Sequence, residues 1–455
     1  MLSINVVSTI FLIEYIISYF IIRRKKDITL FLLFLIFFLP KINIIGVGKM
    51  TTAGIRIDDL IILFLLLKNY RKSTYKNRYV QKGVQLLLLL TTANIISVIT
   101  GIFIGLNSNI LYPILVLVRK FEYFSLIFIG FNMAKKYSYN MNALENEYIR
   151  LNVYLAIIGF MQLFHLCNYA VSGSESDIFS GLVVSTFNGY YEYGQFLIFS
   201  LLFFMLKIPK AQRKIKYIIL FVISFILLYY TNSRTSLLCF LILFLGFLFL
   251  NKSKEKSVSL FKIVTICIFT IILSLILLKK INIDLGRLSN ISISMLIGNF
   301  TNQFKQTNFQ QYYSMVKRGI RVTTMLGNTN DLSTSIRFFK WSAAIDGFFK
   351  YPLFGYGIGI FHVMDGNYIR LLGETGIIGL FLWMKYYCYY LNVFKKRKQV
   401  KILFYFIYLS MISVLISSTF IDMFDASKIM EFLWLIIGVG CSIISNMELD
   451  NSKES

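Results

Sequence analysis

Long apolar runs alternate with short polar segments along almost the whole chain. Most runs approach the roughly 20 apolar residues that one helix needs to cross a bilayer. The pattern therefore predicts an all-α fold, a polytopic bundle of membrane-spanning helices. We expect about thirteen spans, with a range of about 12 to 14, at about 4–22, 28–45, 57–70, 84–104, 112–133, 149–170, 190–207, 215–231, 236–250, 258–279, 371–393, 402–420 and 429–446.

Composition agrees with a membrane protein and argues against other classes. Hydrophobic residues make up 57% of the 455 positions, whereas a soluble domain has about 45–50%. The net charge of +25 is also typical of nucleic-acid-binding proteins. Here the cations gather in short loops between apolar runs, so we expect no nucleic-acid partner. The cysteines lack C-x-x-C spacing and histidines are scarce, so we expect no metal site and no cofactor.

The distribution of Lys and Arg predicts the orientation of the chain. The basic RRKK sequence at 23–26 follows the first apolar run, the reverse of a signal peptide, which places the N-terminus outside. Alternate segments from there are basic, as the positive-inside rule expects of cytoplasmic loops. The intervening segments 105–111, 171–189 and 421–427 carry no Lys or Arg. We therefore expect the C-terminal tail to be cytoplasmic.

The spans divide the chain into three parts. Residues 1–279 form a membrane bundle, 280–370 form a large external loop, and 371–455 hold the last spans and the tail. The loop carries many more cations than carboxylates. Contact with anionic lipid headgroups would explain this excess, and so would recognition of a phosphorylated substrate. Apolar residues at spacings of three and four predict an amphipathic helix over 335–350.

The end of this loop holds the residues best suited to chemistry. Arg337 and Trp341 share one helical face, a combination that suits a fork-like anion contact beside an aromatic ring. The same pair also fits a surface arginine next to a tryptophan at the membrane interface. Pro352 then ends the helix. Gly355 and Gly357 follow in a turn that suits either a phosphate cradle or an ordinary loop.

Other ionisable residues allow both a functional and a structural interpretation. Asp365 suits a general base for a sugar hydroxyl, although an Asp before a helix also commonly serves as its N-cap. Arg234 lies in a very short external turn, where it either snorkels to the interface or binds an anion. Arg119 and Glu192 fall inside expected spans, where each either lines a cavity or stabilises the bundle.

The order and spacing of these residues resemble the bacterial O-antigen polymerase and ligase family of multi-spanning membrane glycosyltransferases. That family pairs about a dozen helices with one large external loop late in the chain. Its loop pattern runs from arginine, tryptophan and alanine through proline and glycines to a His-Asn or Asp-Asn pair, and ends at Gly-x-x-Gly. The matching positions are Arg337, Trp341, Ala344, Pro352, Gly355, Gly357, Asp365, Gly366, Gly376 and Gly379.

Two further segments extend the resemblance. The turn around Arg234 matches an arginine at the outer end of a middle helix, and the turn around Asn188 matches an asparagine- and glycine-rich turn before a span. The resemblance implies an enzyme of the bacterial inner membrane, with an active site on the outer face. We expect Asp365, Arg337 and Arg234 to be catalytic. We expect substrate contacts from Trp341, Gly355, Gly357, Asn367, Arg370, Asn188, Glu192 and Arg119.

The resemblance also implies the partners. Donor and acceptor would be oligosaccharides linked to undecaprenyl diphosphate, with membrane lipids and a chain-length regulator protein as further partners. The arginines would replace a metal at the diphosphate, since the loop has no Asp-x-Asp motif.

The residue at the family's histidine position separates two activities. That histidine stands as Asp365 here, and the residue after it as Gly366. Because ligases typically keep the histidine, the aspartate favours a polymerase of O-antigen or capsule repeat units. Ligase-type glycan transfer is one alternative. A transporter or flippase of lipid-linked oligosaccharide is another, but it predicts two related halves, which the sequence lacks. A scaffold leaves Arg234 and Asp365 unexplained.

Overall fold

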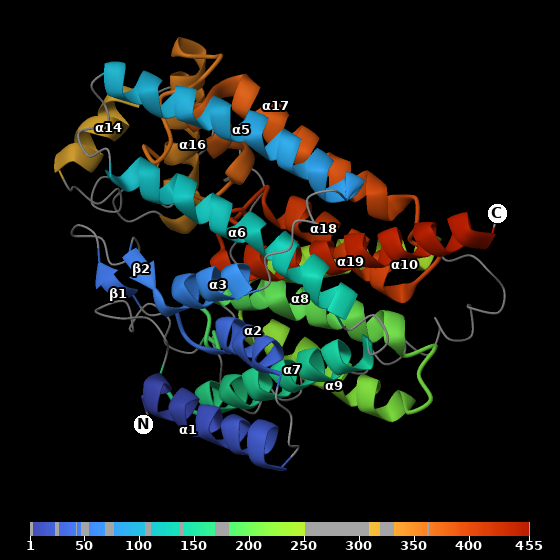
Figure 1. Ribbon diagram of the computed structural model, residues 1–455. Coiled ribbons are helices and arrows are strands. Elements are labelled where there is room, and N and C mark those ends of the chain that lie inside the picture. The colour runs from blue at the N-terminus through green and yellow to red at the C-terminus, as the bar shows by residue number, and fades with distance from the viewer. Residues whose placement is uncertain are drawn as a thin grey trace.

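The protein is helical almost throughout its described length (Figure 1). The computed structural model describes residues 3–22, 27–41, 43–46, 54–68, 77–104, 111–136, 141–168, 182–250, 309–318, 332–361 and 364–454. The helices are α1 (Ile4–Ile16), the π-helix η1 (Ile17–Ile22), α2 (Ile28–Phe38), α3 (Ile57–Lys68), α5 (Arg78–Phe103), α6 (Leu111–Lys136), α7 (Met141–Leu163), α8 (Tyr190–Lys207), α9 (Lys214–Tyr230), α10 (Arg234–Leu250), α14 (Phe309–Arg318), α16 (Leu332–Lys350), α17 (Asn367–Lys395), α18 (Ile402–Ser417) and α19 (Ser427–Glu454).

The helices agree with the all-α prediction. Each expected span falls on one of these helices except 258–279, which lies outside the described residues. Three described segments are both long and apolar enough to cross a membrane, namely Ile4–Ile21, Arg78–Phe103 and Ser427–Leu449. Other apolar helices are shorter, so the count of about thirteen spans stays a prediction.

The second expected span, 28–45, is wrong at its C-terminal end. Helix α2 begins after Asp27, whose side chain accepts a hydrogen bond from the N–H of Thr29, and ends at Phe38. Leu39 is extended, with ψ 144°, because it precedes Pro40. The chain then forms a short antiparallel hairpin of β1 (Asn43–Gly46) and β2 (Gly54–Arg56), which the sequence did not predict.

Helices α6 and α19 cross at very short range in the centre of the bundle (Figure 1). Two glycines make the crossing possible. A Cβ on Gly130 would lie 2.1 Å from the carbonyl oxygen of Leu435, and one on Gly438 would lie 2.2 Å from that of Ile127. Small residues at such contacts let helix backbones approach closely, as in membrane bundles. Helix α19 is accordingly the best buried of the three long apolar segments.

Helices α14 and α16 form a second, smaller core near one end of α5 and α17 (Figure 1). Phe309 of α14 stacks on Tyr356, with ring centroids 3.8 Å apart, and Tyr312 stacks on Phe361. Phe339 and Ala343 of α16 are buried in the same cluster. The expected amphipathic helix over 335–350 is therefore present as α16, and it packs on α17.

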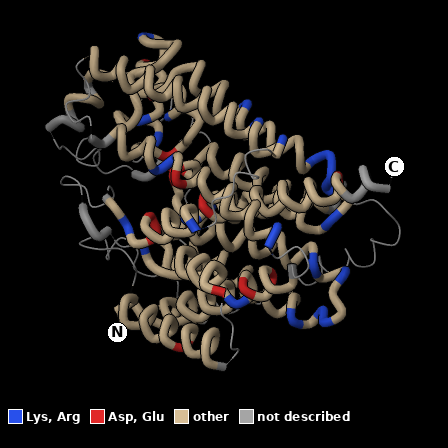
Figure 2. The backbone as a smooth tube through the Cα atoms, in the orientation of Figure 1, with Lys and Arg blue, Asp and Glu red and all other residues tan. Residues whose placement is uncertain are grey.

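Charge is unevenly distributed along the bundle. Figure 2 shows Lys and Arg concentrated at the right-hand end of the view, the side on which the C-terminus lies. This cationic end includes Lys207 at the end of α8, Lys214 at the start of α9 and Lys395 at the end of α17. These are positions expected to be cytoplasmic. The residues expected to bind substrate lie mostly near the other ends of the same helices.

Candidate functional site

Helix α17 is broken near its N-terminal end, and the glycine-rich turn fills the break. Gly376 has a φ of 65°, which interrupts the helix. The N–H groups that follow it donate instead to the turn, from Ile377 to the Pro352 carbonyl at 2.9 Å and from Ile378 to the Leu353 carbonyl at 3.3 Å. A Cβ at position 376 would lie 2.3 Å from the Leu353 carbonyl oxygen, so this approach requires glycine.

The two glycines expected to cradle a phosphate use their N–H groups within the protein. Gly355 donates to the carbonyl of Tyr351 and Gly357 to that of Glu374, each at 3.0 Å. Gly355 also has a φ of 69°, and a Cβ there would lie 2.4 Å from the Glu374 backbone. Both glycines therefore allow the turn to enter the break in α17.

Glu374 ties this turn to the segment before Asp365. The Oε1 atom of Glu374 accepts hydrogen bonds from the N–H groups of Gly359 at 3.0 Å and Phe361 at 3.3 Å. Its carbonyl also accepts a hydrogen bond from Ser97 of α5 at 2.6 Å. The side chain is buried. Sequence analysis did not single out this residue, because a lone Glu in an apolar run has no motif around it.

Asp365 forms an ion pair with Arg337. The Nε atom of Arg337 donates to Oδ2 of Asp365 at 2.7 Å, and the two side chains are 28% and 35% exposed. Nε1 of Trp341 donates to the backbone carbonyl of Asp365 at 2.5 Å. A Cβ on Gly366 would lie 2.7 Å from that Nε1 atom, so the indole packs directly on the Asp365-Gly366 backbone. Three residues that the sequence selected thus meet at one point.

The helix-cap interpretation of Asp365 does not hold. The N-cap of α17 is Gly366, and no side chain caps the helix there. In the part of the chain that the structure describes, Oδ1 of Asp365 accepts no hydrogen bond. Lys340 lies one helical turn beyond Arg337. Burial lowers the pKa of Lys340, although the negative charges of Asp365 and Asp422 oppose this shift. The Asp365 carboxylate therefore faces cations on α16.

Arg370 is surrounded by carboxylates. Its guanidinium donates to Asp422 and to Asp425, and its Nε atom lies 3.9 Å from Glu374. Arg370 is only 6% exposed. We expected this residue to contact substrate, but the contacts fasten α17 to the connection between α18 and α19. We call these four residues the Arg370 cluster.

Two acids of the Arg370 cluster have shifted pKa values. Burial raises the pKa of Asp422 to about 7, a shift that the charge of Arg370 opposes and that of Asp425 reinforces. Burial also opposes ionisation of Asp425, but Arg370 and Lys120 hold its pKa below the ordinary value. The two acids therefore divide into one readily protonated group and one carboxylate.

Asn367 is likewise used within the protein. Its backbone N–H donates to the carbonyl of Ser418 at 2.9 Å, and its side-chain amide donates to Asp422. Its Oδ1 atom accepts a hydrogen bond from the N–H of Phe424 at 3.0 Å. Asn367 therefore fixes the connection between α18 and α19 against the start of α17, directly beside Asp365.

Arg234 is the first residue of α10, in the turn after α9. Among the described residues it forms no ion pair, and it is half-buried. The turn lies against α8, because a Cβ on Gly194 would be 2.6 Å from Oγ of Ser236.

Hydrogen bonds from α8 continue toward α17. Gln195 of α8 donates to Ser413 and accepts from Ser417, both at 2.7 Å and both on α18. Ser418 follows Ser417 at the C-terminal end of α18, and its carbonyl accepts the hydrogen bond from the N–H of Asn367. Tyr191 of α8 lies close enough to Asp365 and Asp422 to interact with their charges. This chain of contacts links the Arg234 turn to the start of α17.

Asn188 and Glu192 lie at the start of α8. Glu192 accepts a hydrogen bond from the backbone of Asn188. It is 6% exposed, and its Oε2 atom has no partner among the described residues. Lys428 of α19 donates nearby to the carbonyl and hydroxyl oxygens of Thr186, at 2.8 and 2.9 Å. Glu192 and Lys428 are therefore both buried beside the segment that contains Asn188.

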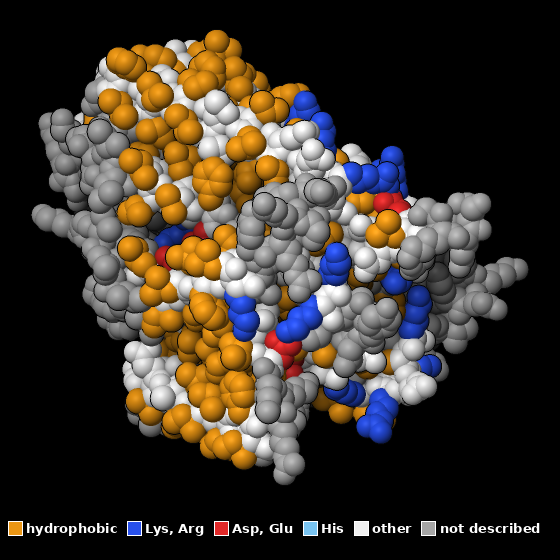
Figure 3. Space-filling view, viewed as in Figure 1, with side chains coloured by type: hydrophobic (Ala, Val, Ile, Leu, Met, Phe, Trp, Pro, Cys, Tyr) orange, Lys and Arg blue, Asp and Glu red, His pale blue; other side chains and the backbone are white. Residues whose placement is uncertain are grey.

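Arg119 lies in a different group of charges. Its Nη2 atom is 3.9 Å from Asp59, at the start of α3. The neighbouring Asp58 binds Lys41, which also donates to both carboxylate oxygens of Glu431 at 2.7 and 2.8 Å. A hollow on the left of Figure 3 has charged side chains at its base and hydrophobic side chains around it. Part of the charged interior therefore reaches the surface.

Comparison with known families agrees with this arrangement. Residues 219–384 match the family model described as O-antigen ligase. This segment of the chain is similar to that family. The matched range begins in α9 and includes Arg234, Arg337, Asp365 and the broken helix α17. The match confirms the resemblance for this segment, and it supports glycan transfer of the ligase or polymerase type. No curated protein matches the chain.

The acids that surround Arg370 were not predicted from the sequence. Asp422 and Asp425 lie in 421–427, a segment noticed only for its lack of Lys and Arg. Two carboxylates in a short connection between apolar helices could have indicated a partner cation, because carboxylates removed from water require one. Their partner, 52 and 55 residues earlier in the chain, becomes apparent only when α17 and α18 pack together.

Proposed function

We propose that this protein polymerises repeat units of a surface polysaccharide, O-antigen or capsule. It transfers the growing glycan from undecaprenyl diphosphate to a hydroxyl of a repeat unit that is itself linked to undecaprenyl diphosphate. The observation that supports this most is the half-exposed Arg337–Asp365 pair, which joins a cation for a diphosphate to a base for a hydroxyl. The match to the O-antigen ligase family covers both residues.

The proposed reaction is a substitution at the anomeric carbon of the donor. The acceptor hydroxyl oxygen forms a bond to this carbon while the bond from the carbon to the phosphate oxygen breaks. Asp365 takes the hydroxyl proton, and undecaprenyl diphosphate leaves with the bonding electron pair. General-base assistance of this kind contributes about 10²–10⁴ in rate.

Cations stabilise the leaving group in this proposal. Arg337 and Arg234 bind oxygens of the diphosphate, and Lys340 adds positive charge beside them. Nε of Arg337 donates to Oδ2 of Asp365 at 2.7 Å. A diphosphate that competes for the guanidinium releases Oδ2 of Asp365, so donor binding would free the base for the acceptor. Metal-independent transfer is part of this proposal.

The remaining predicted residues divide by their contacts. Trp341 holds the Asp365 backbone, and Gly355, Gly357, Asn367 and Arg370 shape the surrounding scaffold, so we assign them positioning roles. Asn188 and Glu192 border the side nearest Arg234 and stay candidates for sugar contacts. Arg119 belongs to the separate Lys41–Asp58 group, and we place it farther from the reaction.

We place the site on the outer face of the bacterial inner membrane. The donor and acceptor lipids reach it from the outer leaflet, and a chain-length regulator protein would act on the same complex. Ligase-type transfer to another acceptor is the second candidate, because the matching family is described as O-antigen ligase. Asp365 at the family's histidine position favours the polymerase.

Product length separates the two activities. Purified protein in lipid nanodiscs, supplied only with the lipid-linked repeat unit, should produce a ladder of glycans that grow by one repeat unit. A ligase given this single substrate should produce no ladder, and it should transfer glycan once when a lipid A-core acceptor is added. A single transfer product with no ladder would overturn the polymerase proposal.

A further inference from the structure

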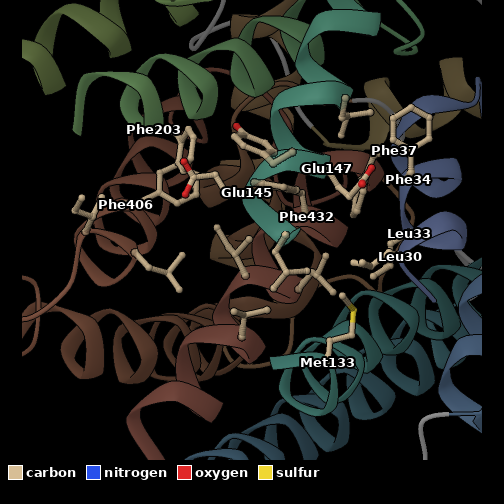
Figure 4. A pocket seen from close by; sticks show the side chains of 18 of the residues that line it. Leu30, Leu33, Phe34, Phe37, Met133, Glu145, Glu147, Phe203, Phe406 and Phe432 are labelled. Atoms are coloured by element: carbon tan, nitrogen blue, oxygen red, sulfur yellow. The ribbon is translucent and has the colours of Figure 1, made fainter. Parts of the chain in front are cut away.

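A large apolar cavity lies among the helices of the bundle, and Lys207 of the cationic end is part of its lining (Figure 4). Its walls come from α2, α6, α7, α8, α18 and α19, and its cavity volume is about 230 Å³. Leu33 and Phe37 of α2 face Phe406 of α18 and Phe432 of α19 across it. It lies beside the first turns of α2 and α18 and the last turn of α8, which the positive-inside rule assigns to the cytoplasmic half of the bilayer.

The chemistry of the walls excludes a polar ligand from the cavity itself. Almost all of the lining is Leu, Ile, Phe, Val or Met. An apolar space of this kind does not hold ordered water, and a void forfeits the dispersion contacts of its lining. A hydrocarbon chain from the surrounding lipid would restore those contacts. The cavity therefore fits acyl chains.

The charged residues of the lining are already balanced. Lys207 pairs with Glu145, which also accepts a hydrogen bond from Tyr217 at 2.7 Å. Glu147 pairs with Arg150 at 3.1 Å. These contacts pair both carboxylates of the lining with cations, so they do not repel an anion.

Exposed cations follow Lys207, the lining residue at the end of α8. Lys210 and Arg213 lie on the connection from α8 to α9, Lys214 and Lys216 lie in the first turn of α9, and all four side chains are exposed. Among the described residues none of them forms an ion pair with a carboxylate. A basic segment on the cytoplasmic side of a membrane attracts anionic lipid headgroups. The apolar cavity and the cations are therefore arranged as the acyl chains and the headgroup of one lipid molecule require.

We propose that this cavity binds an anionic phospholipid of the cytoplasmic leaflet. The acyl chains occupy the apolar cavity, and the phosphate lies against the exposed cations of the α8–α9 connection and the first turn of α9. The lipid binds independently of the glycan site and joins α2 and α7 to α18 and α19 from within the bundle. The proposal goes beyond glycan transfer and does not depend on it.

A cavity-filling variant tests the acyl-chain site. Wild-type protein is reconstituted with equal amounts of phosphatidylglycerol and phosphatidylcholine, and bound lipid is measured by native mass spectrometry. Leu403→Trp places an indole in the cavity from the first turn of α18 and should lower retained phosphatidylglycerol about tenfold. Ile412→Trp, on the same helix but outside the lining, should retain wild-type amounts. Leu144→Phe narrows the cavity from α7 and serves if Leu403→Trp does not fold.

Charge variants test the headgroup site. Lys210→Gln combined with Lys214→Gln should abolish the preference for phosphatidylglycerol over phosphatidylcholine. The matched pair Lys395→Gln and Lys396→Gln, exposed at the same end of the bundle, should preserve it. Equal retention by Leu403→Trp and Ile412→Trp, or no lipid preference in the wild type, would overturn the proposal. Neither result depends on whether the protein makes polysaccharide.

Discussion

Arg337 and Asp365 lie 28 residues apart in the chain, yet Nε of one donates to Oδ2 of the other at 2.7 Å. The contact joins helix α16 of the expected external loop to the start of α17. Both side chains stay about one-third exposed, whereas the side chains of Arg370 and Glu374 are only 7% and 5% exposed. This difference in accessibility separates a pair that can exchange partners with a substrate from one that holds the fold together.

The first prediction concerns the arginines of the proposed diphosphate site. Arg337→Ala and Arg234→Ala should each abolish glycan chain growth, because each removes a cation from the leaving group. Lys at either position should restore activity in part, since a point charge neutralises phosphate without reproducing the guanidinium fork. The measurement is the polysaccharide ladder at matched protein levels. Lys350→Ala, at the exposed end of α16, is the control and should leave the ladder intact. Full-length polymer from both alanine variants would contradict the proposed role.

The second prediction concerns Asp365. Asp365→Asn keeps the shape but loses the base, so the rate of chain growth should fall by about 10²–10⁴. Capping provides no alternative explanation, because Gly366 is the N-cap of α17. Asp365→His should keep some activity if the position corresponds to the family's histidine. The rate is measured with purified protein and lipid-linked repeat unit. Wild-type turnover by Asp365→Asn would show that the carboxylate is structural.

The third prediction concerns pH and Asp422. Burial raises its pKa in the folded protein to about 7, above the ordinary value of 3.8. The folded state therefore binds the proton more tightly than the unfolded state. The stability that Asp422 contributes is present below pH 3.8 and is lost as pH rises through about 7. The lowered pKa of Asp425 has the opposite effect on stability. That effect falls at pH values below the ordinary pKa of 3.8, outside the pH range in which Asp422 titrates.

Asp422→Asn isolates this dependence. Between about pH 5 and pH 8 the apparent melting temperature of the wild type should fall relative to that of Asp422→Asn. Scans in detergent at a fixed rate measure the difference. Curves that run parallel over this range would show that Asp422 does not titrate there.

The fourth prediction concerns the break in α17. Gly376→Ala should destabilise the protein strongly, because a Cβ would lie 2.3 Å from the Leu353 carbonyl and the φ of 65° disfavours alanine. Gly246→Ala is the matched control, since nothing lies within 4 Å of a Cβ there. In a helix interior it should be neutral or stabilise by up to about 1 kcal/mol. Comparable melting temperatures for the two variants would rule out the broken-helix geometry.

The fifth prediction concerns topology. Reporter fusions at Lys76 and Arg397 should report a cytoplasmic location, and a fusion at Asn308 an external one. Arg397 lies at the cationic end, where it donates to Glu448 at 2.9 Å. A cytoplasmic result at Asn308 would place the Arg337–Asp365 pair on the wrong side of the membrane for the proposed lipid-linked substrates.

Much of the helical architecture was predictable because apolar runs of bilayer length leave few alternatives. Helices α8, α9, α10 and α18 begin within a few residues of the expected positions. The span expected at 28–45 was wrong at its C-terminal end, because Pro40 favours an extended conformation at the preceding Leu39. The hairpin of β1 and β2 was not predicted, because seven strand residues give too short a pattern to separate from a loop.

The sequence by itself determined the helices, the cationic end and the two halves of the Arg337–Asp365 pair, because periodicity and motif spacing are local properties. Only the tertiary structure decided which charges face substrate and which face each other. Arg370 and Arg337 read alike in the sequence, but α17 packs Arg370 against Asp422 and Asp425 while Arg337 stays at the surface. The glycines of the 355–359 turn look like a phosphate cradle in the sequence, but in the fold their N–H groups donate to Tyr351 and Glu374. Burial and hydrogen-bond satisfaction depend on segments far apart in the chain, so no local pattern encodes them.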